Sequence, residues 1–306
     1  MTLRVTFLGT SGAVPTAGRN PSALHVNREG EEFLFDAGEG TQRQMMRFST
    51  GFSLSAVFLT HIHGDHVLGL PGLLQTMAFN ERTAPLSVTT PVGTGNEVRK
   101  LLTAIDAGPS FQVDVREVRA GEVAFEGDGY EVRTFETDHR TRSVGYALVE
   151  DDRKGRFDRE RAEELGVPEG PLFSRLHDGE AVELEDGTVV SAEEVVGPPR
   201  AGRRLVYTGD TRPAGSVVEA AHGADLLIHD ATFVEEAATR ARETGHSTAR
   251  EAAEVARRAG AKRLALTHVS SRYAGDVSML ATEAGNVFEG AFVAEDGQRI
   301  DVPYPE

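Results

Sequence analysis

Three histidines and an aspartate lie within six consecutive residues, in a His-Ile-His-Gly-Asp-His motif at residues 61–66. The five residues before the motif are apolar or β-branched, which predicts a buried strand that ends where the motif begins. Residues two apart in an extended loop point the same way, so His61 and His63 can share one metal ion. Asp65 and His66 are then expected to face a second ion. Imidazole and carboxylate ligands suit zinc first, with manganese or iron as alternatives.

Three further residues follow predicted strands and fill the coordination spheres that the motif leaves incomplete. His139 supplies the third nitrogen that the first ion needs, and His268 supplies a nitrogen to the second. Asp210 follows the strand predicted at residues 204–208, after Gly209, and its two carboxylate oxygens can bridge both ions. We therefore predict two zinc ions per chain, with a ligand set made of His61, His63, Asp65, His66, His139, Asp210 and His268.

The His-x-His-x-Asp-His pattern resembles that of the metallo-β-lactamase superfamily. This resemblance implies an α+β fold, an αββα sandwich in which two facing mixed β-sheets are flanked by helices, formed by a single domain over residues 1–306. Strands are predicted at residues 2–9, 23–27, 32–36, 56–60, 86–90, 111–119, 130–136, 144–150, 204–208, 225–228 and 262–267, with one or two more in 291–303. Helices are predicted at residues 42–48, 69–79, 96–105 and 249–259. The last helix has capping-box spacing between Thr248 and Glu251, and Gly260 is a natural stop.

Residues 151–200 differ in composition from the rest of the chain and predict an insertion. Residues 153–161 contain five basic and two acidic side chains, and a turn-rich segment with Gly170-Pro171 follows. We predict an arm made of one short amphipathic helix, a Gly-Pro elbow and a small hairpin. The local excess of positive charge favours contact with an anion.

The chain of 306 residues carries a net charge of −16 and only three lysines. Such a charge predicts a salt-rich cytoplasm, as in a halophilic host, because salt screens self-repulsion. It excludes a broad basic groove for nucleic acid, so we expect no DNA partner, and a polyanion must be held by local arginines, metals and backbone amides. Disulfides and thiolate ligands are excluded because there is no cysteine. No apolar run is long enough to cross a bilayer, and the strand-like N-terminus leaves no room for a signal peptide, so we expect a cytoplasmic protein without a membrane partner.

Motifs throughout the chain resemble those of the RNase Z endonucleases. They are Phe-Leu-Gly-Thr-Ser at residues 7–11, Phe-Asp-Ala-Gly-Glu-Gly-Thr-Gln-Arg at 35–43, Gly-Asp-Thr-Arg at 209–212, His-Asp-Ala-Thr-Phe at 229–233, Gly-His-Ser-Thr at 245–248 and Thr-His-Val-Ser-Ser-Arg-Tyr at 267–273. The resemblance implies a homodimer with a dinuclear zinc site that cleaves precursor tRNA after the discriminator nucleotide. It also implies that the arm at residues 151–200 is an exosite that grips tRNA.

The chemistry assigns a role to several of these residues. Two metals lower the pKa of a bridging water, whose hydroxide attacks the phosphodiester, and Asp65 can take or steer its proton. His246 is the candidate general acid for the departing 3′ oxygen, and Asp230 orients it, where the family usually has Glu. His229 is either an orienting neighbour or a catalyst. Contacts with the substrate are expected from Arg19, Asn20, Arg153, Lys154, Gly170, Pro171, Ser270, Ser271 and Arg272.

Two other functions fit parts of the pattern. A thioester, lactone or aryl ester hydrolase of the same superfamily would use the metals equally well, but would leave the arm and the His246 loop unexplained. A non-catalytic RNA-binding scaffold with a structural metal would explain the arm. It would not require two half-open coordination spheres.

Overall fold

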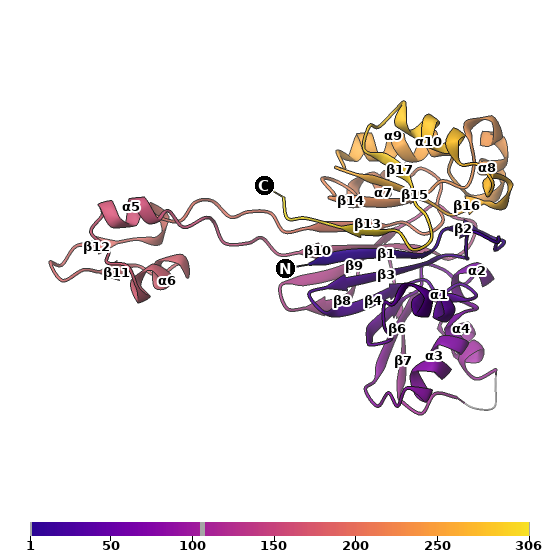
Figure 1. The fold of residues 1–306 in the computed structure, drawn as a ribbon, viewed down its shortest axis with the longest axis horizontal. Helices are drawn as coiled ribbons and strands as arrows, with labels where there is room; N and C mark the ends of the chain where they lie inside the picture. Colours follow the sequence, from indigo (N-terminus) through magenta and orange to yellow (C-terminus); the bar gives the residue numbers. More distant parts are fainter. Residues whose placement is uncertain (1, 105–107, 306) are drawn as a thin grey trace. The chain divides into compact units, whose positions relative to one another are not determined.

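The structure is a computed structural model, and it describes residues 2–104 and 108–305. These residues form two compact units, the first made of residues 2–149 and 204–303 and the second of residues 150–203 and 304–305. In the first unit two seven-stranded sheets face each other, and helices cover the outer face of each sheet (Figure 1). This architecture confirms the predicted α+β sandwich of two facing mixed sheets flanked by helices. No helix among the described residues is long and apolar enough to span a membrane.

The first sheet is antiparallel on one side and parallel from β4 to β7. Its strands in spatial order are β18 (Arg299–Asp301), β1 (Leu3–Gly9), β3 (Ala23–Arg28), β4 (Glu31–Phe35), β5 (Leu54–Phe58), β6 (Leu86–Pro91) and β7 (Val113–Val118). The helices that follow these strands are α1 (Thr41–Phe48), α2 (Gly64–Val67), α3 (Leu70–Phe79) and α4 (Gly95–Leu102). Buried apolar side chains such as Leu34, Val57 and Leu74 join the outer face of the sheet to this helical layer.

The second sheet is antiparallel from β8 to β13 and parallel from β13 to β17. Its strands in spatial order are β17 (Ala291–Val293), β15 (Leu264–Thr267), β14 (Leu226–Asp230), β13 (Arg204–Tyr207), β10 (Val144–Glu150), β9 (Tyr130–Glu136) and β8 (Val123–Gly127). Its helices are α7 (Gly215–Ala220), α8 (Ala238–Thr244), α9 (Ala249–Ala259) and α10 (Ser278–Gly285), with 3-10 turns η2 (Glu235–Ala237) and η3 (Ser271–Tyr273). A short parallel pair joins β2 (Ser11–Gly12), near the start of the chain, to β16 (Val269–Ser270), in its C-terminal part.

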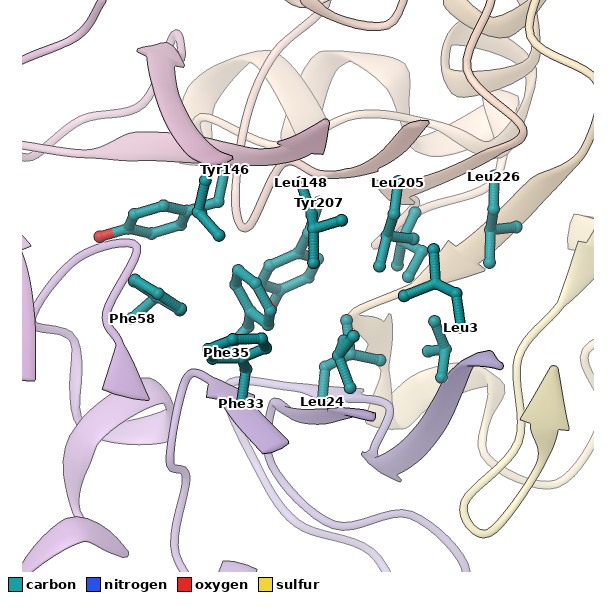
Figure 2. Close-up of a cluster of buried hydrophobic side chains, with 14 of the residues drawn as sticks. Leu3, Leu24, Phe33, Phe35, Phe58, Tyr146, Leu148, Leu205, Tyr207 and Leu226 are labelled. Carbon is teal, nitrogen blue, oxygen red and sulfur yellow. The ribbon is translucent and has the colours of Figure 1, made fainter. Parts of the chain in front are cut away.

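Aromatic side chains fill the space between the two sheets. Figure 2 shows Phe33, Phe35 and Phe58 from the first sheet pointing toward Tyr146 and Tyr207 from the second. The ring centroids of Phe35 and Phe58 are 4.9 Å apart, and those of Phe58 and Tyr146 are 5.3 Å apart. Because alternate residues of a strand face the same side, Phe33 and Phe35 of β4 both point into this space, and both are buried. The packed rings fix the two sheets beneath the strand ends that carry the predicted ligands.

Several short elements of the first unit are absent from the sequence prediction. Strand β8 and helices α7, α8 and α10 are examples, and each spans too few residues for its periodicity to stand out. The turn after β8 contains Asp128-Gly129, the type of pair that favours a hairpin. The helix predicted at residues 96–105 is α4, which ends at Leu102, and residue 105 lies outside the described residues. The predicted capping box and Gly260 stop of α9 are confirmed.

The second unit contains one more helix than the sequence predicts. Besides α5 (Arg159–Glu164), it has α6 (Pro171–His177), which begins where the prediction placed only an elbow. Gly170 has a φ of 144°, and Pro171 takes the first helical position, where proline lacks only a hydrogen bond that no residue there would make. The predicted hairpin is β11 (Val182–Glu183) with β12 (Val189–Val190), followed by η1 (Ala192–Glu194).

A separate apolar core holds the second unit together. Its fully buried members are Ala162, Val167, Leu176, Val182, Val190 and Val195. Where the chain enters and leaves the unit, the buried guanidinium of Arg203 donates two hydrogen bonds of 2.7 Å to the carboxylate of Glu150. The paired geometry satisfies both charges, which burial would otherwise make costly.

Adjacent valines on β12 give a matched test of this core. Val190 is 1% exposed and Val189 is 61% exposed. Val190→Ala should destabilise the second unit by about 2 kcal/mol, since it removes two buried methyl groups and leaves a cavity. Hydrogen exchange of residues 150–203 should rise for this variant and stay unchanged for Val189→Ala. Equal exchange in the two variants would contradict a core of its own for this unit.

Candidate metal centre

The seven predicted ligands come together in the first unit, although four separate strand ends supply them. His61 and His63 follow β5, and Asp65 and His66 lie in the single turn of α2. His139 follows β9, Asp210 follows β13 and His268 follows β15. The motif is extended only as far as His63, which caps α2, so the helical turn redirects the two residues after it.

The first group consists of His61, His63, His139 and Asp210, whose ligand atoms all lie within 4.8 Å of one another. Nδ1 of His63 is 3.0 Å from Nε2 of His61 and 3.4 Å from Nε2 of His139. Burial, followed by the neighbouring charge of His66, holds the pKa of His61 well below its ordinary value. Its imidazole is therefore neutral and offers a lone pair. Converging neutral imidazoles beside a carboxylate are the donor set that a zinc-like cation requires.

The second group consists of Asp65, His66 and His268 and also faces Asp210. Nε2 of His268 is 3.2 Å from Oδ2 of Asp65, and Nε2 of His66 is 3.4 Å from Nε2 of His268. Asp65 is held from outside the group by the backbone N–H of Ala13, which donates to the same Oδ2 over 2.8 Å. These atoms present one carboxylate and two imidazole nitrogens to a common point.

The two oxygens of Asp210 face different groups. Oδ2 is 3.6 Å from Nε2 of His61, whereas Oδ1 is 3.3 Å from Nε2 of His66 and 3.2 Å from Nε2 of His268. Oδ1 is buried and has no hydrogen-bond partner among the described residues. A buried carboxylate oxygen is normally paired, so this atom indicates that a cation belongs beside it. The residues present therefore fit two metal ions that share Asp210.

The second ring nitrogen of most of these histidines has its own partner, which fixes the orientation of the ring. Nδ1 lies 3.0 Å from the Thr60 hydroxyl in His61, 2.8 Å from the Asp36 carboxylate in His66, 2.8 Å from the Gly245 carbonyl in His139 and 2.8 Å from the Thr232 hydroxyl in His268. In each case Nε2 is left to face the centre.

Asp36 is a functional residue that the sequence reasoning missed. Its buried carboxylate accepts hydrogen bonds from the backbone N–H and hydroxyl of Thr60, from the hydroxyl of Tyr207 and from Nδ1 of His66. Its φ is 57°, in the left-handed region that only a well-determined surrounding sustains in a residue other than glycine. The signal was present in the sequence, because Asp36 ends a predicted strand just as Asp210 does.

Close backbone contacts explain two glycines near the centre. A Cβ atom on Gly12 would lie 2.7 Å from Nδ1 of His268, which has a φ of 61°. A Cβ atom on Gly209 would lie 2.7 Å from the side chain of Thr60. Any larger residue at either position would displace a residue of the centre.

Asp230 and His246 form a pair beside the second group. Nδ1 of His246 donates to Oδ2 of Asp230 over 2.8 Å, so aspartate spans the distance despite being one methylene shorter than glutamate. Asp230 also accepts hydrogen bonds from Thr211 and from the backbone and hydroxyl of Thr232. Because both its oxygens are satisfied, Asp230 is suited to orienting His246 and not to binding a metal.

The protonation of His246 follows from its surroundings. Burial alone would lower the pKa of His246, but the charge and hydrogen bond of Asp230, together with the charge of Asp210, raise it to about 9. His246 thus has a proton to donate. His229 is buried, and its Nδ1 donates to the carbonyl of Asp230. Nε2 of His229 has no partner among the residues that the structure describes.

The residues predicted to contact substrate occupy different environments. Arg19 is buried, and its Nη1 donates to the hydroxyl of Thr10 and to the carbonyl of Ala294, both over 2.6 Å. Asn20 donates to the carbonyl of Glu39. Both side chains therefore brace the loop that precedes β3.

The remaining predicted contacts lie after His268 or in the second unit. Ser270 belongs to β16, and Ser271 and Arg272 are exposed in η3. In the second unit, Arg153 stacks on Tyr304 with its guanidinium carbon 3.9 Å from the ring centroid, and Lys154 pairs with Asp178 over 2.5 Å. Gly170 and Pro171 are exposed. The roles of all these residues toward substrate stay predictions.

Comparison with known proteins places this centre in a family. One family model, described as a beta-lactamase superfamily domain, matches residues 185–269, and another, described as anti-Pycsar protein Apyc1, matches residues 3–154. The chain is 64% identical over 307 residues to a ribonuclease Z of Natronomonas pharaonis, with 100% of both chains covered. It is 63% identical over 307 residues to a ribonuclease Z of Haloferax volcanii, covering 100% of this chain and 97% of that one.

A solved structure agrees with these relatives. The crystal structure of human tRNase Z, short form, matches with a TM-score of 0.71 and 28% identity, covering 98% of this chain and 99% of the other. The predicted superfamily and family are therefore confirmed. This chain belongs to the ribonuclease Z family, within the metallo-β-lactamase superfamily.

Proposed function

We propose that this enzyme hydrolyses one phosphodiester bond of precursor tRNA just after the discriminator nucleotide, in the cytoplasm. The reaction removes the 3′ trailer and leaves a 3′-hydroxyl and a 5′-phosphate. The observation that carries the proposal is the pairing of His246 with Asp230 beside two groups of metal ligands. A ribose oxygen is a poor leaving group that needs a proton, and this pair supplies one. A thioester hydrolase needs no such acid, and a scaffold needs no open coordination positions.

The test of this function is direct. The purified, metal-loaded protein is incubated at high salt with a 3′-extended tRNA, and the new ends are mapped. Cleavage after the discriminator nucleotide is expected. Cleavage elsewhere, or none at all, would contradict the proposal.

Each of the proposed catalytic residues has its own role in the reaction. Two bound zinc ions, or manganese or iron in their place, would acidify a shared water and neutralise the non-bridging oxygens of the phosphate. Asp65, whose Oδ2 is already oriented by Ala13, takes or steers the proton of the attacking water. Asp210 holds the two ligand groups together through its two oxygens. His246 donates its proton to the departing 3′ oxygen, and Asp230 keeps the imidazole protonated and in place.

The number of ions can be measured. We expect about two metal ions per chain in the intact protein, since seven ligands are too many for one tetrahedral zinc. Asp210→Ala should lose metal and activity together, because it removes the oxygens that both groups face. Elemental analysis after dialysis reports the metal content. A fully active protein with a single tightly held ion would contradict two ions per chain.

The contribution of His246 to the rate should be separable from metal binding. General acids contribute roughly a hundred- to ten-thousand-fold to rate, so His246→Ala should lower turnover of precursor tRNA by about that factor. Metal content should be unchanged, and Asp230→Asn should cost less because the imidazole remains. The loss should shrink on bis(p-nitrophenyl) phosphate, whose leaving group departs without a proton. Equal losses on both substrates would mean that His246 only shapes the site.

We propose that the second unit binds tRNA, with contacts from Arg153, Lys154 and the Gly170-Pro171 segment. The exposed side chains of Lys154, Arg156, Arg159 and Arg161 support this role, as does the separate core that folds the unit. Arg19, Asn20 and residues 270–272 would assist in the first unit, Arg19 and Asn20 by bracing their loop.

Removal of the second unit should separate binding from chemistry. Replacing residues 151–202 with a short linker should weaken tRNA binding by about tenfold or more, since one charged hydrogen bond alone contributes about 1.5 kcal/mol. Hydrolysis of bis(p-nitrophenyl) phosphate should persist, because this segment supplies no metal ligand. Binding is measured with an uncleaved tRNA. Loss of activity toward both substrates would show that the segment supports the core.

We propose a homodimer that uses the helical layer over the first sheet. Met46 on α1, Leu68 after α2 and Phe79 at the end of α3 are large apolar side chains that are 66%, 55% and 86% exposed. Apolar side chains exposed this far commonly mark an interface between proteins.

This interface predicts a mutational effect on assembly. The double variant Met46→Asp, Phe79→Asp should weaken dimerisation about 30-fold or more, as expected for hot-spot residues. Light scattering after size-exclusion chromatography gives the mass. Met279→Asp, on α10 and 52% exposed, is the matched control and should leave the mass unchanged. A wild-type monomer, or the reverse pattern, would contradict the proposed face.

A further inference from the structure

Arg212 lies two residues after Asp210 and has no role in the chemistry described above. Its side chain is largely buried and points at the loop that carries His246. Nη1 donates to the backbone carbonyl of His246 over 2.6 Å. Nη1 and Nη2 also donate to the two carboxylate oxygens of Glu251, both over 2.6 Å. A guanidinium that makes a two-pronged carboxylate contact is held in one plane, so its contact with His246 is fixed as well.

Glu251 passes this constraint to the start of α9. Its carboxylate accepts a hydrogen bond from the backbone N–H of Thr248, and the Thr248 hydroxyl accepts one from the N–H of Glu251. Arg212 is therefore hydrogen-bonded to the glutamate of a capping box that begins two residues after His246. The loop is fixed at His246 itself and at the helix that follows it.

The backbone beside Arg212 holds two further loops of the centre. The N–H of Arg212 donates to the carbonyl of Asp138, the residue before the ligand His139, over 2.8 Å. The carbonyl of Thr211 accepts a hydrogen bond of 2.7 Å from the hydroxyl of Ser247. The loops that carry Asp210, His139 and His246 thus meet at residues 211–212.

We infer that Arg212 is a positioning residue that sets the placement of His246 through the His246 carbonyl and Glu251. The inference rests on the proposed role of His246 as the general acid. Without the guanidinium, the residues after Gly245 would lose a side-chain anchor, and the ring would be less well placed to donate its proton. Small displacements of a catalytic group lower the rate while leaving the group present.

The geometry separates this role from direct contact with RNA. Three N–H donors of Arg212 are engaged within the protein, and its carboxylate partner neutralises its charge. If Arg212 contacted a phosphate, its replacement would reduce the affinity for tRNA, and the reduction would depend strongly on salt. A positioning role lowers kcat and leaves the affinity for uncleaved tRNA unchanged.

The experiment compares two versions of one precursor tRNA. One carries the natural 3′ oxygen at the cleaved bond, and the other carries sulfur there, which departs as a thiolate without needing a proton. Arg212→Gln should lower kcat on the oxygen substrate about 10- to 100-fold, the usual size of effect for a group behind a catalytic residue. The loss should largely disappear on the sulfur substrate. The kcat of Arg212→Lys should lie between those of the wild type and Arg212→Gln, because an ammonium keeps the positive charge but cannot make the two-pronged contact of a guanidinium.

Three measurements do not depend on the reaction. Metal content and affinity for uncleaved tRNA should match the wild type, and hydrogen exchange of residues 244–250 should rise in the metal-free protein. Glu251→Gln can still cap α9 but offers Arg212 no charged partner, so it should share the kinetic defect even if Arg212→Gln folds poorly. Arg250→Gln is the matched control, because its exposed side chain pairs with Glu254 on the same helix, and it should resemble the wild type.

A double-mutant comparison decides whether Arg212 acts through His246. Adding Arg212→Gln to His246→Ala should cause little further loss, since the positioned group is already absent. Additive losses, lost metal, weaker tRNA binding or an equal defect on the sulfur substrate would each overturn the inference. If His246→Ala itself shows no difference between oxygen and sulfur, the proposed acid has failed. If His246→Ala shows the difference and Arg212→Gln does not, only the inference about Arg212 has failed.

Discussion

The carboxylate of Asp36 is the buried group on which the rest of the centre depends. It directly follows β4 of the first sheet, and it accepts hydrogen bonds from Thr60, two residues after β5 of the same sheet, and from Tyr207 in the second sheet. A carboxylate this deeply buried is tolerated because polar donors surround it on every side. Its remaining partner is Nδ1 of His66, so one group both joins the sheets and orients a metal ligand.

The position of Tyr207 extends this link to the other ligand group. Tyr207 ends β13 and stands three residues before Asp210, whose oxygens face both groups of ligands. Its ring also packs in the aromatic core, edge-on to Phe35 with the centroids 6.2 Å apart. The separation of the two ligand groups is therefore set by the packing of the sheets. Close-packed interiors resist such displacement.

The seven candidate ligands could be proposed from the sequence because each one lies in a short motif or just after a predicted strand. His61, His63 and His139 each follow a segment whose strand pattern is plain, and the structure brings the ends of these strands together although they belong to different sheets. The family motifs extended this to His246 and Asp230. The αββα architecture was predicted from the resemblance to the metallo-β-lactamase superfamily, and the predicted strands and helices agree with two sheets flanked by helices.

Other features depend on contacts between distant segments that no local pattern encodes. Asp36 lies 171 residues from Tyr207, and Arg212 lies 39 residues from Glu251. Helix α6 was not predicted, because Gly170-Pro171 is compatible with a turn as well as with the start of a helix. The burial of Arg19 was also hidden, since arginine is seldom inside a protein unless its donors are satisfied. The sequence thus indicated the groups proposed to carry the chemistry more readily than the groups that position them.

The acidic surface raises the question of how this enzyme holds a polyanion. Several basic side chains of the second unit already have acidic partners: Arg159 pairs with Glu163 and Glu169, Arg161 with Glu164, Arg175 with Glu180 and Lys154 with Asp178. These pairs are exposed, and exposed pairs contribute little to stability, least of all in high salt.

A phosphate can therefore replace a carboxylate beside each arginine at little cost in free energy. The same salt weakens the gain from releasing counterions of the RNA, so the exchange of partners is nearly neutral overall. Affinity must then come from the match between the arrangement of these side chains and the spacing of the phosphates. For this reason a folded second unit, with a core of its own, suits tRNA recognition at high salt better than a flexible basic tail, which relies on net charge alone.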